Sequence, residues 1–119
     1  MGENDNIPQM TPSFENICRK DEKGNEYWSS RDLCGAMGYS AYWKFQRVID
    51  KAIKVAGEKG MNVDEHFNQA VDMVRIGSGS FRKVNIFRLS RMACMIVAEN
   101  ADAKKVLVQH ARDYFTQTI

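Results

Sequence analysis

The chain has 119 residues, 44% of them hydrophobic and 10% aromatic, so it is long enough for one domain with a sizeable core. Its net charge of +2 is too small to indicate nucleic-acid binding by itself, so such a function depends on where the charges lie. No apolar stretch approaches the roughly 20 residues of a membrane helix, and no signal-peptide pattern opens the chain. Three cysteines without a C-x-x-C pair argue against a disulfide framework or a zinc site. We therefore expect a cytoplasmic protein that uses no metal, no cofactor and no membrane.

The N-terminal part of the chain predicts a leader and a short hairpin. Residues 1–12 are polar, contain both prolines and show no periodicity, which indicates a flexible leader. We expect one domain over residues 13–119. Residues 14–19 and 26–28 flank a polar turn that contains Gly24, and this pattern is typical of a hairpin.

Two helices are predicted next. The first covers residues 31–37, with Ser29 or Ser30 as its N-cap. The second covers residues 41–58, with Ser40 as its N-cap, and is clearly amphipathic. Its apolar residues recur at three- and four-residue spacing and form one face: Phe45, Val48, Ile49, Ala52, Val55 and Ala56. Its cations follow the same spacing and form another face: Lys44, Arg47, Lys51 and Lys54.

The middle of the chain predicts a third helix followed by the central hairpin. Asn62 is a suitable N-cap for a helix over residues 63–70. The expected strands cover residues 72–76 and 84–88, because both segments are rich in branched and aromatic side chains. The Gly-Ser-Gly-Ser run at residues 77–80 supplies glycines that permit a tight turn.

Two further helices complete the predicted fold. Ser90 caps a helix over residues 89–99 that contains seven consecutive apolar residues, which indicates a helix surrounded by protein. Asp102 caps the last helix, over residues 103–118, whose predicted stripe consists of Ala103, Val106, Leu107, His110, Ala111, Tyr114 and Phe115. No stop signal ends this helix, so we expect the chain to be the N-terminal part of a longer protein. The fold class is compact α+β, with about five helices and one or two β-hairpins around the 89–99 helix.

Several short motifs, in the same order, resemble the DNA-damage-inducible protein D family. These motifs are WSSRDL (28–33), MGYS (37–40), DMVRIGSG (72–79), LSRMAC (89–94), ENAD (99–102) and YFTQT (114–118). The resemblance implies a BRO-type N-terminal domain, a mixed α and β module that binds DNA. It also implies induction in the SOS response and an influence on recombinase filaments. The segment NIFR (85–88) departs from the family pattern and makes the hairpin more basic.

Two sets of cations are candidates for nucleic-acid binding. Basic side chains on a two-stranded ribbon can approach a phosphate backbone, which makes candidates of Arg75, Arg82, Lys83 and Arg88. The helix stripe of Lys44, Arg47, Lys51 and Lys54 can follow phosphates in the same way. Both sets are also compatible with ordinary solvated surfaces, and the alternation of residues does not settle which hairpin cations face outward. Trp43 or Tyr42 could stack on unpaired bases, whereas Phe45 is assigned to the core.

No pattern in the sequence points to catalysis. His66 and His110 belong to no nucleophile or metal motif, and Ser90 is interpreted as a helix cap. We therefore predict a non-enzymatic, DNA-associated regulatory domain whose partners are single- or double-stranded DNA and a recombinase. The alternative is a protein-interaction module that acts on a recombinase or another partner without DNA contact, with a homo-oligomer formed through the last helix. In that case the same cations would meet an acidic protein surface.

Overall fold

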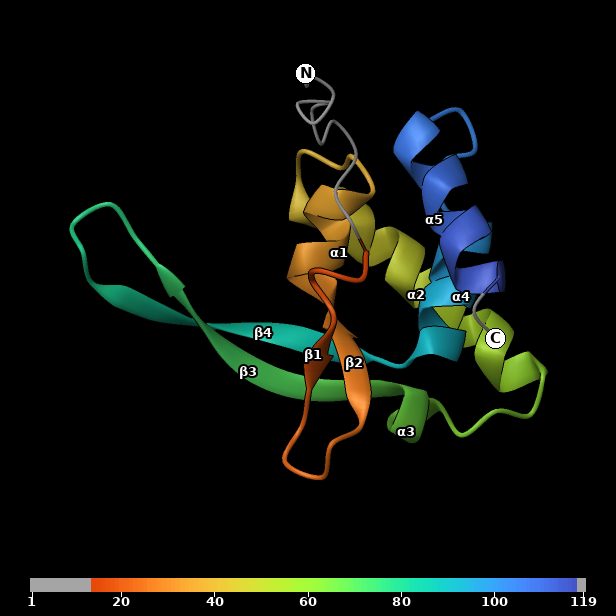
Figure 1. Ribbon diagram of the computed structural model, residues 1–119, viewed down its shortest axis with the longest axis horizontal. Coiled ribbons are helices and arrows are strands. Elements are labelled where there is room, and N and C mark those ends of the chain that lie inside the picture. The colour runs from red at the N-terminus through yellow and green to blue at the C-terminus, as the bar shows by residue number, and fades with distance from the viewer. Residues whose placement is uncertain (1–13, 118–119) are drawn as a thin grey trace, which may run out of the picture.

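The computed structural model describes residues 14–117, and the predicted leader lies outside them. Within this range the chain forms a four-stranded antiparallel sheet in the order β1-β2-β4-β3, with helices packed together beside it (Figure 1). The strands are β1 (Arg19–Lys20), β2 (Glu26–Ser29), β3 (Phe67–Arg75) and β4 (Phe81–Leu89). The helices are α1 (Ser30–Ala36), α2 (Tyr42–Glu58), α3 (Val63–His66), α4 (Arg91–Asn100) and α5 (Val106–Gln117). The α+β class is confirmed.

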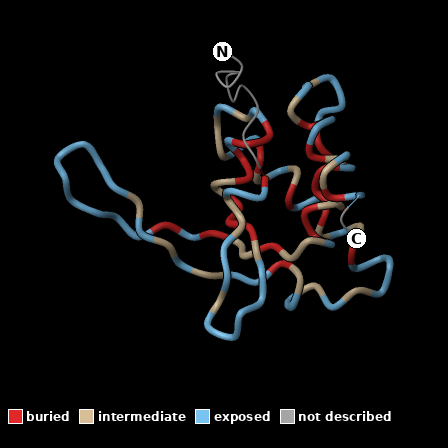
Figure 2. The backbone as a smooth tube through the Cα atoms, in the orientation of Figure 1, coloured by how far each residue is buried: buried red, intermediate tan, exposed pale blue. Residues whose placement is uncertain are grey.

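The core lies between the helices and the base of the sheet. Helix α4 packs against both α2 and α5, and Figure 2 shows most of the buried backbone in this part of the molecule. On the sheet side, Trp28 of β2 pairs with Leu89 of β4, and both are fully buried. The Trp28 ring meets the Phe115 ring edge to face at 5.1 Å. The central position predicted for the 89–99 helix is therefore confirmed, although Met92 in its first turn is 39% exposed.

Most predicted helix starts are confirmed. The Ser90 hydroxyl accepts a hydrogen bond from the Ala93 N–H at 3.1 Å, and the Asn62 side chain accepts one from the Glu65 N–H at 3.2 Å. Ser29 caps α1. The Ser40 cap is wrong, because α2 begins after Ala41 without any side-chain cap.

The predicted helix over residues 63–70 is wrong in its second half. Helix α3 ends at His66, and the chain continues as β3 from Phe67. Phe67 pairs with Leu89, and the register then runs without interruption to Arg75 opposite Phe81. Backbone pairing with a nine-residue partner strand outweighs the weak helix preference of the segment, so the hairpin is longer than the sequence indicates.

The predicted first strand, residues 14–19, is also too long. Residues 14–17 form a turn, and β1 consists of Arg19 and Lys20 alone. The Phe14 ring packs against the Phe115 ring of α5, with the ring centroids 5.5 Å apart, so this residue belongs to the helical core and not to the sheet. The turn prediction itself is confirmed, because Gly24 has a φ of +84°.

The last helix starts later and faces differently than predicted. Asp102 accepts from the Lys104 N–H at 3.0 Å and so holds a turn that precedes α5. The residues that enter the core are Ala111 and Phe115, which the predicted stripe contains, and Val108, which it left out. Val106 is 66% exposed and His110 is exposed, so their assignment to the apolar stripe was wrong. The buried stripe is rotated by part of a turn from the predicted one. Apolar residues occur on more than one side of this helix, so both stripes have the three- and four-residue spacing of a helix face.

The described residues contain neither a disulfide nor a membrane-spanning helix. Cys18, Cys34 and Cys94 are all free, as predicted. Among residues 14–117 no helix is long and apolar enough to cross a bilayer. In the same range no cluster of three or more His, Cys, Asp or Glu side chains is arranged to hold a metal ion.

Candidate nucleic-acid interface

The distal part of the β3–β4 hairpin projects away from the rest of the molecule (Figure 1). We call residues 71–85 the arm; most of its backbone is exposed (Figure 2). At its tip the Ile76 N–H donates to the Ser80 carbonyl at 2.9 Å, and Gly79 turns the chain with a φ of +85°. Glycine is favoured in this left-handed conformation, so the predicted glycine turn is confirmed.

The arm is positively charged beyond its root. Asp72, at the root, is held 3.5 Å from the Arg19 guanidinium, which also binds Asp32 at 2.8 Å. Beyond Asp72 the arm contains no acid and three cations, which are Arg75, Arg82 and Lys83. All three are exposed, and none forms an ion pair with a residue that the structure describes. Their charge is therefore available to a partner.

The strand register divides these cations between the two faces of the arm. Lys83 pairs with Met73, and Arg75 pairs with Phe81. Paired residues of antiparallel strands share a face, so these four side chains lie together, while Arg82 belongs to the opposite face. Met73 is 51% exposed and Phe81 is 57% exposed, and the Arg75 guanidinium lies 5.7 Å from the Phe81 ring. We call this surface the mixed face of the arm, because it combines cations with apolar side chains.

Arg88 is separated from the other hairpin candidates. It pairs with Ser29 at the base of the sheet, and its guanidinium lies 4.8 Å from the Tyr27 ring. Glu22 approaches it at 3.8 Å, and only 33% of its side chain is exposed. The structure therefore does not bring Arg88 together with the cations of the arm.

The cations of α2 form the exposed stripe that the spacing predicts. Lys44, Arg47, Lys51 and Lys54 are all exposed, and the four core residues of α2 lie on the other side of the helix. Trp43 stands beside this stripe and is 61% exposed, with the charged groups of Lys44 and Arg47 each 5.6 Å from its ring. An exposed aromatic ring beside cations has the geometry that stacking on an unpaired base requires. Phe45 is fully buried, which confirms its assignment to the core.

Helix α2 is joined to the base of the arm by a short hydrogen-bonded chain. The Phe87 N–H donates to the Ser30 hydroxyl at 3.0 Å, and this hydroxyl lies 2.7 Å from the Tyr42 hydroxyl. The Arg31 guanidinium covers the Tyr42 ring at 4.2 Å. Burial raises the pKa of the Tyr42 hydroxyl, so it remains a neutral hydrogen-bonding group. Tyr42 is thus part of a structural junction, and Trp43 is the better placed of the two stacking candidates.

Sequence reasoning missed a pairing between His66 and Ser90. The His66 Nδ1 lies 2.6 Å from the Ser90 hydroxyl, and the Ser90 N–H donates to the His66 carbonyl at 3.1 Å. Both residues line a polar cleft of about 570 Å³ whose other walls include Glu22, Glu26 and Glu65. Because the Ser90 hydroxyl already caps α4, the contact ties α3 to the start of α4. His66 and Ser90 are 24 positions apart in the sequence, so no local pattern indicates their contact. The contact follows from the pairing of β3 with β4, which places the two residues side by side.

Comparison with known proteins gives one informative match. The chain is 37% identical over 102 residues to the DNA damage-inducible protein D of Escherichia coli strain K12. The match covers 86% of this chain but only 37% of the length of that relative. No family model matches the chain, and no solved structure does. The BRO-type assignment therefore stays a prediction.

Proposed function

We propose that this chain, which belongs to the DNA damage-inducible protein D family, serves in the response to DNA damage by binding nucleic acid through its arm. The family membership supports the damage-response role. The chain spans only 37% of its relative's length. That it shares the activity of a full-length family member is therefore also a proposal. We further propose that binding modulates recombinase filaments, which the family resemblance supports, and that the domain acts without catalysis.

The arm carries this proposal. Its exposed cations, Arg75, Arg82 and Lys83, have no acidic neighbour beyond Asp72. They occur on both faces of a two-stranded ribbon, and a ribbon of this kind fits the major groove of duplex DNA or lies along a single strand. Phosphate contacts of this type give affinity with little sequence preference.

The α2 stripe supplies a second set of phosphate contacts in the proposed interface. Its four cations are exposed, and Trp43 beside them can stack on unpaired bases. Asp50, the one acid between Lys44 and Lys54 in the sequence, accepts a hydrogen bond from the Gln46 side chain at 3.0 Å. The polar cleft beside His66 has several carboxylates in its walls and is therefore a poor surface for phosphates.

A protein-interaction role is the second candidate, and the apolar side chains of the arm favour it. Val71, Met73 and Phe81 are each more than half exposed, and β3 is an edge strand of the sheet. An exposed edge with apolar side chains can add a strand from a partner such as a recombinase or a second copy of the chain. Under this reading the cations of the arm would meet acidic side chains, and the exposed Val106 of α5 would belong to a separate homo-oligomer contact through the last helix.

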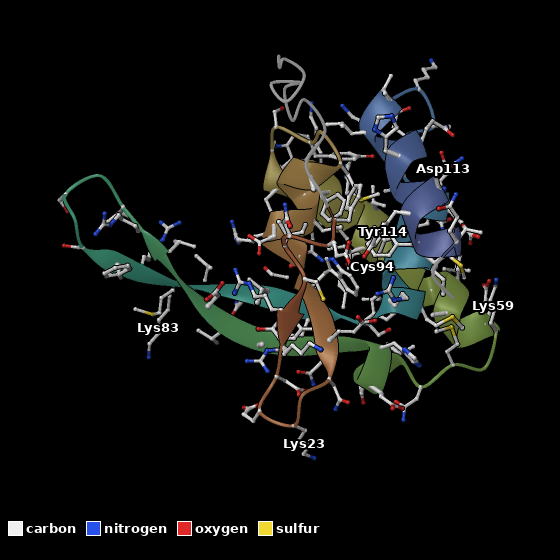
Figure 3. The ribbon with its side chains drawn as sticks, viewed as in Figure 1. Lys23, Lys59, Lys83, Cys94, Asp113 and Tyr114 are labelled. Atoms are coloured by element: carbon white, nitrogen blue, oxygen red, sulfur yellow. The ribbon has the colours of Figure 1, made fainter. Side chains whose placement is uncertain are left out.

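The test is fluorescence anisotropy of labelled single-stranded and duplex DNA at several salt concentrations. The variant Arg82→Glu/Lys83→Glu alters the arm, and Lys59→Glu/Lys104→Glu makes the same change in net charge elsewhere. Figure 3 shows Lys83 on the arm and Lys59 at the opposite end of the molecule. We expect the arm variant to reduce the slope of log affinity against log salt by about 1.4 on single strands and about 1.8 on duplex DNA. The control variant should keep most of the wild-type slope.

Two outcomes would contradict the proposal. If the wild-type domain binds neither DNA at low salt, phosphate binding is wrong and the protein-interaction role is favoured. If the arm variant binds as tightly as the control variant, the contacts lie outside the arm. Measuring binding to a purified recombinase with the same variants separates the two candidate functions.

A further inference from the structure

A pocket of about 310 Å³ lies where α2 meets the arm root. Its lining comes from α2 and from both long strands: Gln46, Gln69, Ala70, Asn85, Ile86 and Phe87. This volume is at the lower end of the range for sites that enclose small organic groups, about 300 to 1,000 Å³. The pocket is therefore large enough for one planar ring system.

Three of the lining side chains are primary amides. Gln69 and Asn85 are exposed, and no described residue gives their side chains a hydrogen-bond partner. Gln46 donates through Nε2 to the Asp50 carboxylate at 3.0 Å, which fixes its amide and leaves its carbonyl oxygen as an acceptor. A side-chain amide offers a donor and an acceptor side by side, and this arrangement matches the edges of nucleobases.

The other walls suit the flat surface of a base. Phe87 is half-buried and belongs to the lining, on the same face of the hairpin as Gln69 and Asn85. Phe87 is also held in place from its backbone, because its N–H donates to the buried Ser30 hydroxyl at 3.0 Å. An aromatic wall with amides near it is the combination that proteins use to recognise an unpaired base.

The pocket continues into the mixed face of the arm. By the strand register Gln69 lies opposite Phe87, and Asn85 lies opposite Val71 on the same face. Two residues further along each strand this face carries Met73 and Lys83. A strand of nucleic acid whose phosphates contact Lys83 would therefore have a base within reach of the pocket. The exposed Trp43 is three residues before Gln46 in α2, so the two side chains lie on the same side of the helix.

We propose that this pocket binds an unpaired nucleobase of a single-stranded nucleic acid, with Gln69 and Asn85 contacting the base edge. The inference rests on the proposed phosphate binding by the arm and adds a base-reading site to it. A base within a duplex is stacked and paired, so it cannot enter the pocket without being extruded. The domain should accordingly prefer single strands to duplexes of equal length at high salt, where phosphate contacts are weakest.

The test compares two single-stranded oligonucleotides of the same length, one with bases and one made entirely of abasic sites. The phosphates are the same, so only base contacts distinguish the two. We expect the wild-type domain to bind the base-containing strand about tenfold more tightly. The variant Gln69→Ala/Asn85→Ala should lose most of this preference, retaining only what stacking on Trp43 supplies, and should keep the wild-type affinity and salt slope for the abasic strand. Gln117→Ala, which removes an exposed amide at the end of α5, should retain the preference.

The outcomes separate this inference from the proposed function. Equal wild-type affinity for both strands would overturn the base site and leave phosphate binding intact. A preference that persists undiminished in the double variant would overturn the site as well, and it would assign the base contacts to other residues such as Trp43. A double variant that binds both strands equally weakly would also contradict base recognition, because its effect would then lie in the fold or the phosphate contacts. Absence of binding to either strand would overturn both proposals.

Discussion

Removing the Ser30 hydroxyl should destabilise the junction between the sheet and α2. Ser30 is fully buried, and its hydroxyl accepts from the Phe87 N–H at 3.0 Å and lies 2.7 Å from the Tyr42 hydroxyl. In Ser30→Ala the backbone N–H of Phe87 loses its acceptor at a half-buried position. The Tyr42 hydroxyl, also half-buried, loses a partner that water can partly replace.

The expected loss can be estimated from these two groups. A buried donor left without an acceptor costs about 1 to 3 kcal/mol. Phe87 and Tyr42 are only half-buried, so water reaches them in part and we expect a value in the middle of this range. We therefore expect Ser30→Ala to lower the free energy of unfolding by about 2 kcal/mol, measured by urea denaturation monitored by circular dichroism. A loss of this size is a large part of the roughly 5 to 15 kcal/mol that stabilises a typical domain.

Two further variants test the reasoning behind this estimate. Ser40→Ala changes an exposed serine outside the junction and should stay within about 0.5 kcal/mol of wild type. Tyr42→Phe combined with Ser30→Ala should cost less than the sum of the single changes, because the two hydroxyls share one hydrogen bond. A loss below about 0.5 kcal/mol for Ser30→Ala, or full additivity, would refute the proposed network.

Three other predictions concern the tip, the base of the sheet and the exposed tryptophan. Gly79→Ala should lower the free energy of unfolding by about 1 kcal/mol, because residue 79 has a φ of +85°. Gly77→Ala should leave the free energy of unfolding nearly unchanged, and equal effects of the two variants in urea titrations would contradict this prediction. Glu26 accepts a hydrogen bond from the Arg91 guanidinium at 2.7 Å, which lowers the pKa of the Glu26 carboxyl. The contribution of this ion pair to the free energy of unfolding is therefore present above the ordinary glutamate pKa of about 4.3 and is lost as the pH falls below that value. The stability gap between wild type and Glu26→Gln should therefore close in acid, and a gap independent of pH would refute this. Single-stranded DNA should quench tryptophan fluorescence in the wild type and not in Trp43→Phe, because the other tryptophan, Trp28, is fully buried; quenching retained in the variant would exclude stacking on residue 43.

Features that depend on neighbours in the chain could be predicted from the sequence. The Ser90 and Asn62 caps are correct because each side chain bonds an N–H three residues further along. The Gly24 and Gly79 turns are correct because each needs a positive φ that other residues adopt at a cost. The cationic stripe of α2 is correct because helical spacing alone sets which residues share a face.

Two of the errors arose where segments far apart in the chain meet. Residues 67–70 continue a helical pattern locally, but their backbone pairs with residues 86–89 in the sheet. His110 fits an apolar spacing, yet α5 turns Val108 and Phe115 into the core because their partners lie on β2 and α4. In both cases a contact between residues far apart in the chain decided between alternatives that the local pattern permitted.

The sequence by itself determined the α+β class, most helix starts, the glycine turns and the two sets of cations, because these follow from interactions over three or four residues. Only the tertiary structure divided the hairpin cations, placing Arg82 and Lys83 on opposite faces of the arm and Arg88 near Glu22 at its base. It alone brought Gln46 beside Gln69 and Asn85 in one pocket. Strand register and helix docking are set by pairing and burial across the whole chain, so the positions that face one another in the candidate site cannot be deduced from local spacing.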